Sequence, residues 1–196
     1  MFPVIGTKDL LVDVFYVIDS SADTSSPLFD NIKKFVLRDI RKSAAESSAY
    51  KVAVVNYGAT ADTVSEFELL NDYNDKAKII TSMTPIGGVR RTDLALRLLY
   101  KDLFPKSERG RKKHVMIFVT GNSTVVNGLE ALSRAMQKMD AVITVVAIGD
   151  NIDYAQLDDI ASSYNRIFQF SSGDQLIDVV DEFAVNKEDF EGNILP

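Results

Sequence analysis

Short runs of apolar residues alternate along the chain with longer segments in which apolar residues recur every three or four positions. The short runs are rich in β-branched residues and nearly uninterrupted, which predicts strands buried on both faces of a parallel sheet. They cover residues 52–55, 115–119 and 142–148, and further strands are expected at residues 12–18 and near 167–170. The segment 63–68 instead alternates between apolar and polar residues and follows the run at 52–55 after a short turn at 58–60. We therefore expect it to form an antiparallel edge strand.

Between these runs, apolar residues spaced by three and four positions form single stripes, the pattern of amphipathic helices. The stripes comprise Phe29, Ile32, Val36 and Ile40; Leu94 and Leu98; Leu129, Leu132, Met136 and Met139; and Leu176, Val179, Val180 and Phe183. A short helix is also expected at 153–162. Ser26 followed by Pro27 predicts the start of the first helix, and Thr92 is expected to cap the helix that contains Leu94.

The order of these elements predicts the fold class. Strands that alternate with helices indicate an α/β, doubly wound sheet. We expect a mostly parallel six-stranded sheet with one antiparallel edge strand and helices on both faces, which is a Rossmann-like arrangement. A chain of 196 residues is long enough to form one such domain with a sizeable core.

Composition excludes several classes of protein. The net charge of −6 argues against general nucleic-acid binding, and no apolar stretch approaches the length of a membrane span. The absence of cysteine excludes disulfides, a thiolate nucleophile and cysteine-ligated zinc. Residues 1–6 lack the basic start and apolar core of a signal peptide, so we expect either a cytoplasmic protein or a domain cut from a longer chain.

Several oxygen donors stand on one short loop directly after the first predicted strand, in the sequence Asp19-Ser20-Ser21-Ala22-Asp23. Carboxylate and hydroxyl oxygens clustered in this way suit a hard divalent cation such as Mg²⁺. Ligands of a doubly wound sheet bind beyond the carboxyl ends of its strands. The loops at 87–92, 121–124 and 149–153 are therefore expected to approach the same rim.

At these positions the chain resembles the von Willebrand factor type A domain family, also called integrin I-like domains, from about residue 9 to residue 183. The resemblance is carried by Asp13 to Ser21, Gly87-Gly88 ahead of Thr92 to Leu96, Val119-Thr120-Gly121, Val145 to Gly149, and Leu157 to Ser162. Within this family, the sequence motifs most resemble those of the tandem A domains of matrix proteins, such as type VI collagen chains and matrilins. The resemblance implies a domain at 9–184 with linker segments at 1–8 and 185–196.

In that family a metal-ion-dependent adhesion site holds Mg²⁺ with a D-x-S-x-S loop, a Thr after paired glycines and the Asp of a T-D-G turn. The first loop matches at Asp19 and Ser21, whereas Asp23 stands where the second Ser is expected. The glycine motif, G-G-x-T-x-T, lays without gaps on the sequence and puts Arg90 at the ligand Thr and Thr92 at the second Thr.

The remaining ligand position, the Asp of the T-D-G turn, is Gly121, which has no side-chain oxygen. Arg90 carries a permanent cation that only donates hydrogen bonds and cannot ligate a metal. We therefore expect its guanidinium to replace the cation and to pair with Asp19 and Asp23. In the alternative, Arg90 points to solvent and a weakly bound, partly hydrated Mg²⁺ remains on Asp19, Ser21 and Asp23.

Three further features of the sequence are a basic segment, a glycosylation sequon and a single histidine. The basic segment from Lys106 to His114 is interpreted as a solvated loop before a strand, in preference to a patch for sulfated glycosaminoglycans, and should lie at the end of the sheet opposite to Arg90. Asn122 begins an N-x-T glycosylation sequon on the rim. His114 is the only histidine and has no nucleophile beside it, which argues against a catalytic triad or a zinc site.

The resemblance implies a non-enzymatic interaction or adhesion module of an extracellular protein, with matrix proteins or neighbouring domains of a longer chain as partners. A second possibility keeps the metal, with a partner's carboxylate completing the shell of a cation on the first loop. A third is a phosphotransfer or hydrolytic enzyme that uses Asp19 and Asp23. We disfavour the third because the sequence has no well-placed lysine and no second acidic loop.

Overall fold

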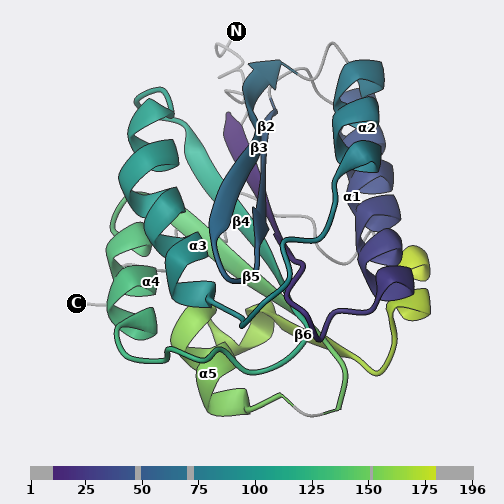
Figure 1. The fold of residues 1–196 in the computed structure, drawn as a ribbon. Helices are drawn as coiled ribbons and strands as arrows, with labels where there is room; N and C mark the ends of the chain where they lie inside the picture. Colours follow the sequence, from purple (N-terminus) through teal and green to yellow (C-terminus); the bar gives the residue numbers. More distant parts are fainter. Residues whose placement is uncertain (1–10, 47–49, 70–72, 151, 180–196) are drawn as a thin grey trace, which may run out of the picture.

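Six strands form one sheet in the computed structural model, which describes residues 11–46, 50–69, 73–150 and 152–179 (Figure 1). The strand order is β3-β2-β1-β4-β5-β6. The strands are β1 (Val12–Asp19), β2 (Lys51–Tyr57), β3 (Ala61–Leu69), β4 (Lys112–Val119), β5 (Ala141–Ile148) and β6 (Ile167–Phe170). All neighbouring strands pair in parallel except β2 and β3, which are antiparallel. The predicted fold class is confirmed, including the antiparallel edge strand.

Helices cover both faces of this sheet. The α-helices are α1 (Ser26–Glu46), α2 (Tyr73–Ser82), α3 (Thr92–Leu98), α4 (Leu129–Gln137) and α5 (Tyr154–Ile160). Helices α1 and α2 lie on one face and α3, α4 and α5 on the other (Figure 1). Short helical turns follow α3 (Leu99–Leu103 and Phe104–Lys106) and flank β6 (Tyr164–Arg166 and Gly173–Asp178).

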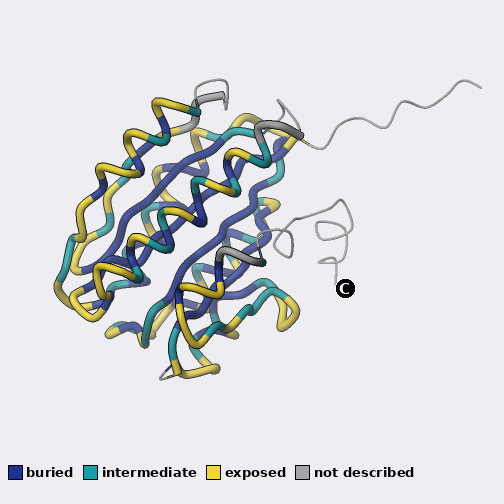
Figure 2. The backbone as a smooth tube through the Cα atoms, turned by 90° about the vertical axis from the view of Figure 1, so that its right-hand side faces the viewer, coloured by how far each residue is buried: buried dark blue, intermediate teal, exposed yellow. Residues whose placement is uncertain are grey.

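Strand β1 lies in the middle of the sheet, and each of its residues is buried. Figure 2 shows that the buried, dark blue parts of the chain run through the middle of the molecule. Successive side chains of a strand point to opposite faces. Phe15 and Val17 accordingly belong to the core beneath α3, α4 and α5, whereas Tyr16 and Ile18 belong to the core beneath α1 and α2. The same alternation places Asp13 and Asp19 on the side of Phe15 and Val17. A buried apolar strand thus carries one carboxylate near its start and one at its end.

Two predicted helix starts are wrong by one residue. The first helix begins at Ser26, and the preceding Ser25 caps it, because its Oγ accepts a hydrogen bond from Leu28 N at 3.4 Å. Helix α3 begins at Thr92 itself, and Arg91 occupies the N-cap position without a side-chain bond to the helix. Shifts of one residue are usual, because cap residues belong half to the helix.

Helix α2 was not among the predicted stripes. Its buried residues are Lys76 and Ile80. An amphipathic helix would have an apolar residue at both positions, and the lysine at position 76 interrupts that pattern. Lys76 Nζ donates to Val52 O at 3.3 Å and to Ser65 Oγ at 3.2 Å, which satisfies the buried ammonium group. The last predicted stripe is a 3-10 helix at Gly173–Asp178, and Val180 and Phe183 lie outside the described residues.

No helix among the described residues has the length and apolar character required to cross a membrane.

Candidate functional site

The loops that follow β1, β4 and β5 meet at one end of the sheet, as expected for parallel strands (Figure 1). A fourth loop, between α2 and α3, joins them through backbone hydrogen bonds from Gly87 N to Ser20 O at 2.8 Å and from Ala22 N to Gly88 O at 2.9 Å. We call these loops the loop rim. It comprises residues 20–25, 85–91, 120–128 and 149–153, of which residue 151 lies outside the described part.

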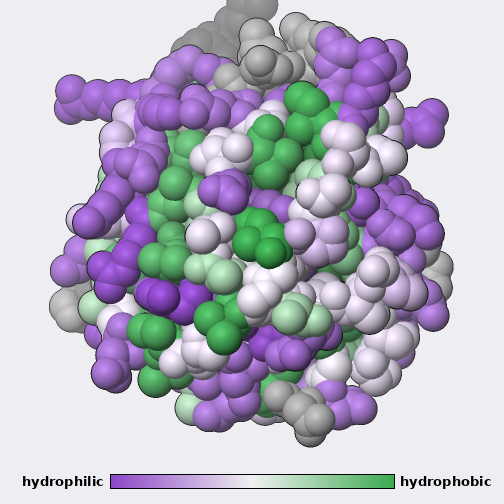
Figure 3. Space-filling model, viewed as in Figure 1, coloured by the Kyte–Doolittle hydropathy of each residue, from purple (hydrophilic) through white to green (hydrophobic). Residues whose placement is uncertain are grey.

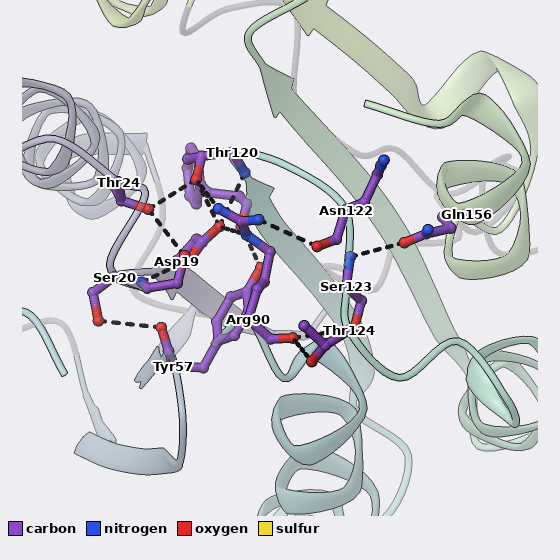
Figure 4. A network of polar contacts seen from close by, with 12 residues as sticks. Asp19, Ser20, Thr24, Tyr57, Arg90, Thr120, Asn122, Ser123, Thr124 and Gln156 are labelled. Carbon is purple, nitrogen blue, oxygen red and sulfur yellow. Dashed lines mark hydrogen bonds and ion pairs between the residues drawn. The ribbon is translucent and has the colours of Figure 1, made fainter. Parts of the chain in front are cut away.

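Asp19 is the carboxylate at the centre of the loop rim, and its side chain is 0% exposed. Its Oδ2 accepts hydrogen bonds from Arg90 Nε at 2.5 Å, Thr120 Oγ1 at 2.8 Å and Thr120 N at 3.0 Å. Its Oδ1 accepts from Ser21 N at 2.9 Å. Each oxygen of the carboxylate is therefore engaged by protein donors, three of them on one oxygen (Figure 4).

The Arg90 guanidinium lies over this carboxylate and is almost as deeply buried, with 4% of the side chain exposed. Besides Nε, its Nη2 donates to Thr120 Oγ1 at 3.0 Å and its Nη1 donates to Asn122 O at 3.2 Å. All three guanidinium nitrogens thus have acceptors. A buried charge pair of this kind is stable only where its hydrogen-bonding capacity is met, because removing the ions from water is costly.

The backbone around Arg90 is shaped by two glycines. Gly87 and Gly88 have φ values of 74° and 70°, a left-handed conformation that favours glycine. A Cβ at Gly88 would also lie 2.6 Å from Ala59 Cβ, so only glycine fits this approach of two loops. Beyond the turn, Arg90 O accepts hydrogen bonds from Thr124 N at 3.0 Å and Thr124 Oγ1 at 2.8 Å. These bonds fix the direction in which the arginine side chain leaves the loop.

Gly121 provides the space that the guanidinium occupies. A Cβ at position 121 would lie 2.5 Å from Arg90 Nη1, 3.0 Å from Cζ and 3.2 Å from Nη2. Any larger residue at 121 would displace Arg90 from its acceptors. The two departures from the family motif are therefore complementary, because the loss of the side chain at 121 makes room for the arginine from position 90.

A chain of hydroxyl groups leads into the same carboxylate, and of its members only Ser21 was predicted as a site residue. Ser21 Oγ lies 3.4 Å from Thr24 Oγ1, which lies 2.8 Å from Thr120 Oγ1 (Figure 4). Since Thr120 Oγ1 donates its proton to Asp19, the other hydroxyls are oriented toward Thr120 in turn. Their position in rim loops was visible in the sequence, but their convergence on one atom was not.

Tyr57 lies beside the Asp19–Arg90 pair (Figure 4). It is fully buried at the end of β2, and its hydroxyl donates to Phe118 O at 2.9 Å. Burial raises the pKa of the Tyr57 hydroxyl well above its usual value, the negative charge of Asp19 raises it further, and Arg90 opposes the rise. The phenol is therefore neutral at physiological pH.

The side chains of the other predicted site residues form no hydrogen bond or ion pair with Asp19 or Arg90 in the described part of the chain, although Asn122 contacts Arg90 through its backbone oxygen. Asp23 is exposed and forms no ion pair with any described residue, so the expected contact between Arg90 and Asp23 is absent from this part of the structure. Thr92 is buried at the start of α3, where its hydroxyl has no hydrogen-bond partner among the described residues. Asn122 is exposed, and its Oδ1 accepts a hydrogen bond from Asp153 N at 2.7 Å.

These side chains do not fit a divalent cation. The Asp19 oxygens are engaged by protein donors, and the position from which a second carboxylate would reach a metal is Gly121. The guanidinium of Arg90, 2.5 Å from Asp19 Oδ2, would also repel a divalent ion at this carboxylate. In the described ranges, no group of three or more His, Cys, Asp or Glu side chains could hold a metal.

The basic segment lies at the opposite end of β1, as expected, and residues 106–110 are largely exposed, but the segment is buried from Arg111 onward except for the half-buried Lys112. Arg111 is buried and forms an ion pair with Asp13, and its Nη2 donates to Val12 O at 2.9 Å. Lys113 is also buried, and burial lowers the pKa of its ammonium group. The prediction of a solvated loop is therefore wrong for Arg111. Its charge is neutralised by Asp13, which allows the side chain to be buried over the start of β1.

The von Willebrand factor type A domain is the family model that matches this chain, over residues 13–182. Among curated relatives, collagen alpha-1(VI) chain of Gallus gallus is 27% identical over 149 residues, which covers 72% of this chain and 14% of the relative. Collagen alpha-6(VI) chain of Homo sapiens is 25% identical over 169 residues, covering 85% and 7%. For von Willebrand factor of Rattus norvegicus, identity is 25% over 145 residues, covering 72% and 32%. The chain thus spans a minor part of the length of these relatives.

Among solved structures, this chain is similar to proximal thread matrix protein 1 from the mussel byssus, with a TM-score of 0.79. That structure is described as having a zinc-occupied MIDAS motif, which is the metal-ion-dependent adhesion site. It is 22% identical and is matched over 89% of this chain and 45% of its own. At this identity the likeness establishes the fold.

Proposed function

We propose that this chain, which belongs to the von Willebrand factor type A domain family, is a non-enzymatic protein-interaction module in which Arg90 replaces the cation of the adhesion site. Relatives of matching sequence include extracellular matrix and multidomain adhesion proteins, such as collagen VI chains and von Willebrand factor. By this proposal the module is extracellular, spans about residues 9–184, and binds matrix proteins or neighbouring domains. Its binding does not require a metal ion.

The observation that carries this proposal is the 2.5 Å contact between Arg90 Nε and Asp19 Oδ2 in the space left open by Gly121. A metal would need the same carboxylate and the same space. The guanidinium gives the carboxylate a fixed positive partner, which is the electrostatic role that the cation has in the family. The loop rim is then held together at all times, in metal-free solution as well.

Two measurements test the proposal. Isothermal titration calorimetry with Mg²⁺ and Mn²⁺ should show no binding tighter than a dissociation constant of about 1 mM. Binding to immobilised purified matrix proteins should then be the same in EDTA as in Mg²⁺. Submillimolar cation binding, or loss of matrix binding in EDTA, would exclude the cation-replacement part. Failure to bind any matrix protein in a broad panel would exclude the interaction part.

The second candidate, metal-dependent binding at Asp19, Ser21 and Asp23, is favoured by the zinc-occupied site of the mussel neighbour. It would require Arg90 to leave Asp19, and the calorimetric titration distinguishes the two. An enzyme that uses Asp19 as a nucleophile is disfavoured, because the buried carboxylate is held by four hydrogen bonds.

A further inference from the structure

Both positive charges of the loop rim are paired with carboxylates of the chain itself. Arg90 and Arg91 are the only Lys or Arg residues in the rim loops. Arg90 is buried against Asp19, and Arg91 donates to both carboxylate oxygens of Asp93 at 2.8 and 2.9 Å. Bidentate pairing of this kind fixes the guanidinium and neutralises it.

The negative charges of the loop rim are exposed instead. Asp23, Asp150 and Asp153 all have exposed side chains, and none forms an ion pair with a described residue. Asp153 additionally accepts a hydrogen bond from Ala155 N at 2.9 Å, which leaves its charge intact. The rim therefore presents a negative field to an approaching molecule, which favours a positively charged partner.

Exposed apolar side chains also lie on or beside the loop rim. Val89 is 56% exposed, Val126 is 42% exposed, and Tyr154, at the first position of α5 beside the rim, is 52% exposed. Half of the exposed large hydrophobic side chains of the described residues are thus on or beside this rim, the others being Leu11, Ile79 and Tyr164. Figure 3 shows hydrophobic side chains among polar ones down to the lower end of the molecule, where Figure 1 places the rim loops.

The loops that carry these side chains adjoin. Thr124 N donates to Arg90 O at 3.0 Å, which joins the loop of Val126 to that of Val89. Asn122 Oδ1 accepts from Asp153 N at 2.7 Å, which joins the same loop to the start of α5. The three apolar residues therefore lie on adjoining loops, which these hydrogen bonds hold together.

We infer that the loop rim binds a basic polypeptide segment whose Lys or Arg residues are interspersed with apolar side chains. This deepens the proposed function and rests on it, since it names the partner class of the same rim. It also inverts the chemistry of the metal-dependent site, in which the partner supplies a carboxylate to a cation. The lysine or arginine side chains meet Asp23, Asp150 and Asp153, and the apolar side chains cover Val89, Val126 and Tyr154.

The experiment uses two immobilised ten-residue peptides that share Leu and Tyr positions and differ only in having Lys or Glu between them. Binding of the unmodified chain is measured by interferometry in EDTA at low and high salt. The rim triple variant Asp23→Lys, Asp150→Lys, Asp153→Lys is compared with a matched control, Asp102→Lys, Glu130→Lys, Asp158→Lys, which makes the same change in net charge at exposed sites on other elements.

The lysine peptide should bind at least about tenfold more tightly than the glutamate peptide, with the preference reduced by salt. The rim triple variant should lose this preference, and the control variant should keep it. Val89→Ser with Val126→Ser should weaken lysine-peptide binding severalfold. No binding of the lysine peptide, equal binding of both peptides, or equal loss in the control variant would each overturn the inference. The panel of purified matrix proteins, tested in the same buffer, separates this failure from that of the proposed function, because matrix binding would persist.

Discussion

Gly121 makes room for Arg90, since a Cβ at position 121 would lie 2.5 Å from Arg90 Nη1. Positions 90 and 121 are far apart in the sequence, but the residues at both must fit the same small space beside Asp19. A guanidinium can stand over Asp19 only if position 121 has no side chain. Substitution of either residue alone should therefore disturb the other.

Gly121→Ala should destabilise the domain by about 1–3 kcal/mol, because the new methyl group displaces a buried guanidinium whose three nitrogens all donate hydrogen bonds. Chemical denaturation monitored by circular dichroism measures this change. Gly110→Ala is a useful comparison. Both substitutions remove a glycine, but a Cβ at Gly110 meets nothing within 4 Å, and its φ of +87° adds only local backbone strain. Equal stability of Gly121→Ala and the parent would contradict the steric argument.

Arg90→Met should cost about 3–5 kcal/mol of folding free energy, because Asp19 is left buried without its charged partner. The double variant Asp19→Asn, Arg90→Met should recover most of this loss, since it removes both charges. A double-mutant cycle by urea denaturation measures the coupling. Additive effects of the two substitutions would show that the pair has no special interaction.

Restoring the family residues should restore metal binding. In Arg90→Thr, Gly121→Asp, Asp23→Ser, the cation-replacing charge is gone and the missing oxygen donors return. We expect Mg²⁺ to bind this variant measurably by calorimetry and to raise its melting temperature, whereas the parent gives no response. Arg90→Thr alone serves as the control that lacks the second carboxylate. If the triple variant folds and still ignores Mg²⁺, the loop geometry itself has diverged from the metal site.

Alkaline pH should destabilise the domain through Tyr57. Burial raises the pKa of this phenol in the folded state above its value in the unfolded chain. The unfolded state then loses its proton first, so the free energy of unfolding falls as pH rises above about 10, by up to about 1.4 kcal/mol per pH unit for each such group. Tyr16, whose pKa burial and Asp39 also raise, should add a similar decline. Urea titrations between pH 8 and 11 measure the slope, and it should become shallower in Tyr57→Phe; an unchanged slope would assign the decline elsewhere.

The basic segment should divide into structural and dispensable residues. Arg111→Met should destabilise the domain by about 3–5 kcal/mol, because it leaves Asp13 buried and unpaired. Arg109→Met, an exposed neighbour of the same type, should change stability by less than about 0.5 kcal/mol. Thermal denaturation of the two variants measures the contrast. Similar losses from both would contradict the distinction between a buried and a solvated arginine.

Asn122 should carry a glycan when the chain is expressed through a secretory pathway, because it begins an N-x-T sequon and its side chain is exposed on the loop rim. Mass spectrometry of intact protein, with Asn122→Gln as the control, detects the added mass. Secreted protein whose mass shows no glycan at Asn122 would contradict this prediction.

Much of this protein was determined by its sequence alone. Nearly uninterrupted apolar runs indicate the buried strands, an alternating segment indicates the edge strand, and stripes of period 3.6 indicate the helices. The order of those elements leaves few topologies open. The paired glycines, the Asp19 loop and the missing carboxylate at Gly121 were likewise readable, since motif positions depend on spacing. Helix α2 was missed because its buried face carries Lys76, whose ammonium group donates hydrogen bonds to β2 and β3, and only the folded chain brings these strands near it.

The tertiary structure decided which partner each charge received. Sequence spacing could not tell whether Arg90 would meet Asp19 or Asp23, because the choice depends on side-chain direction and on the space beside Gly121. It also could not show that Arg111 is buried rather than solvated, since Asp13 lies 98 positions away. Local periodicity encodes the backbone elements, whereas the balance between desolvation and pairing is settled only where distant segments meet.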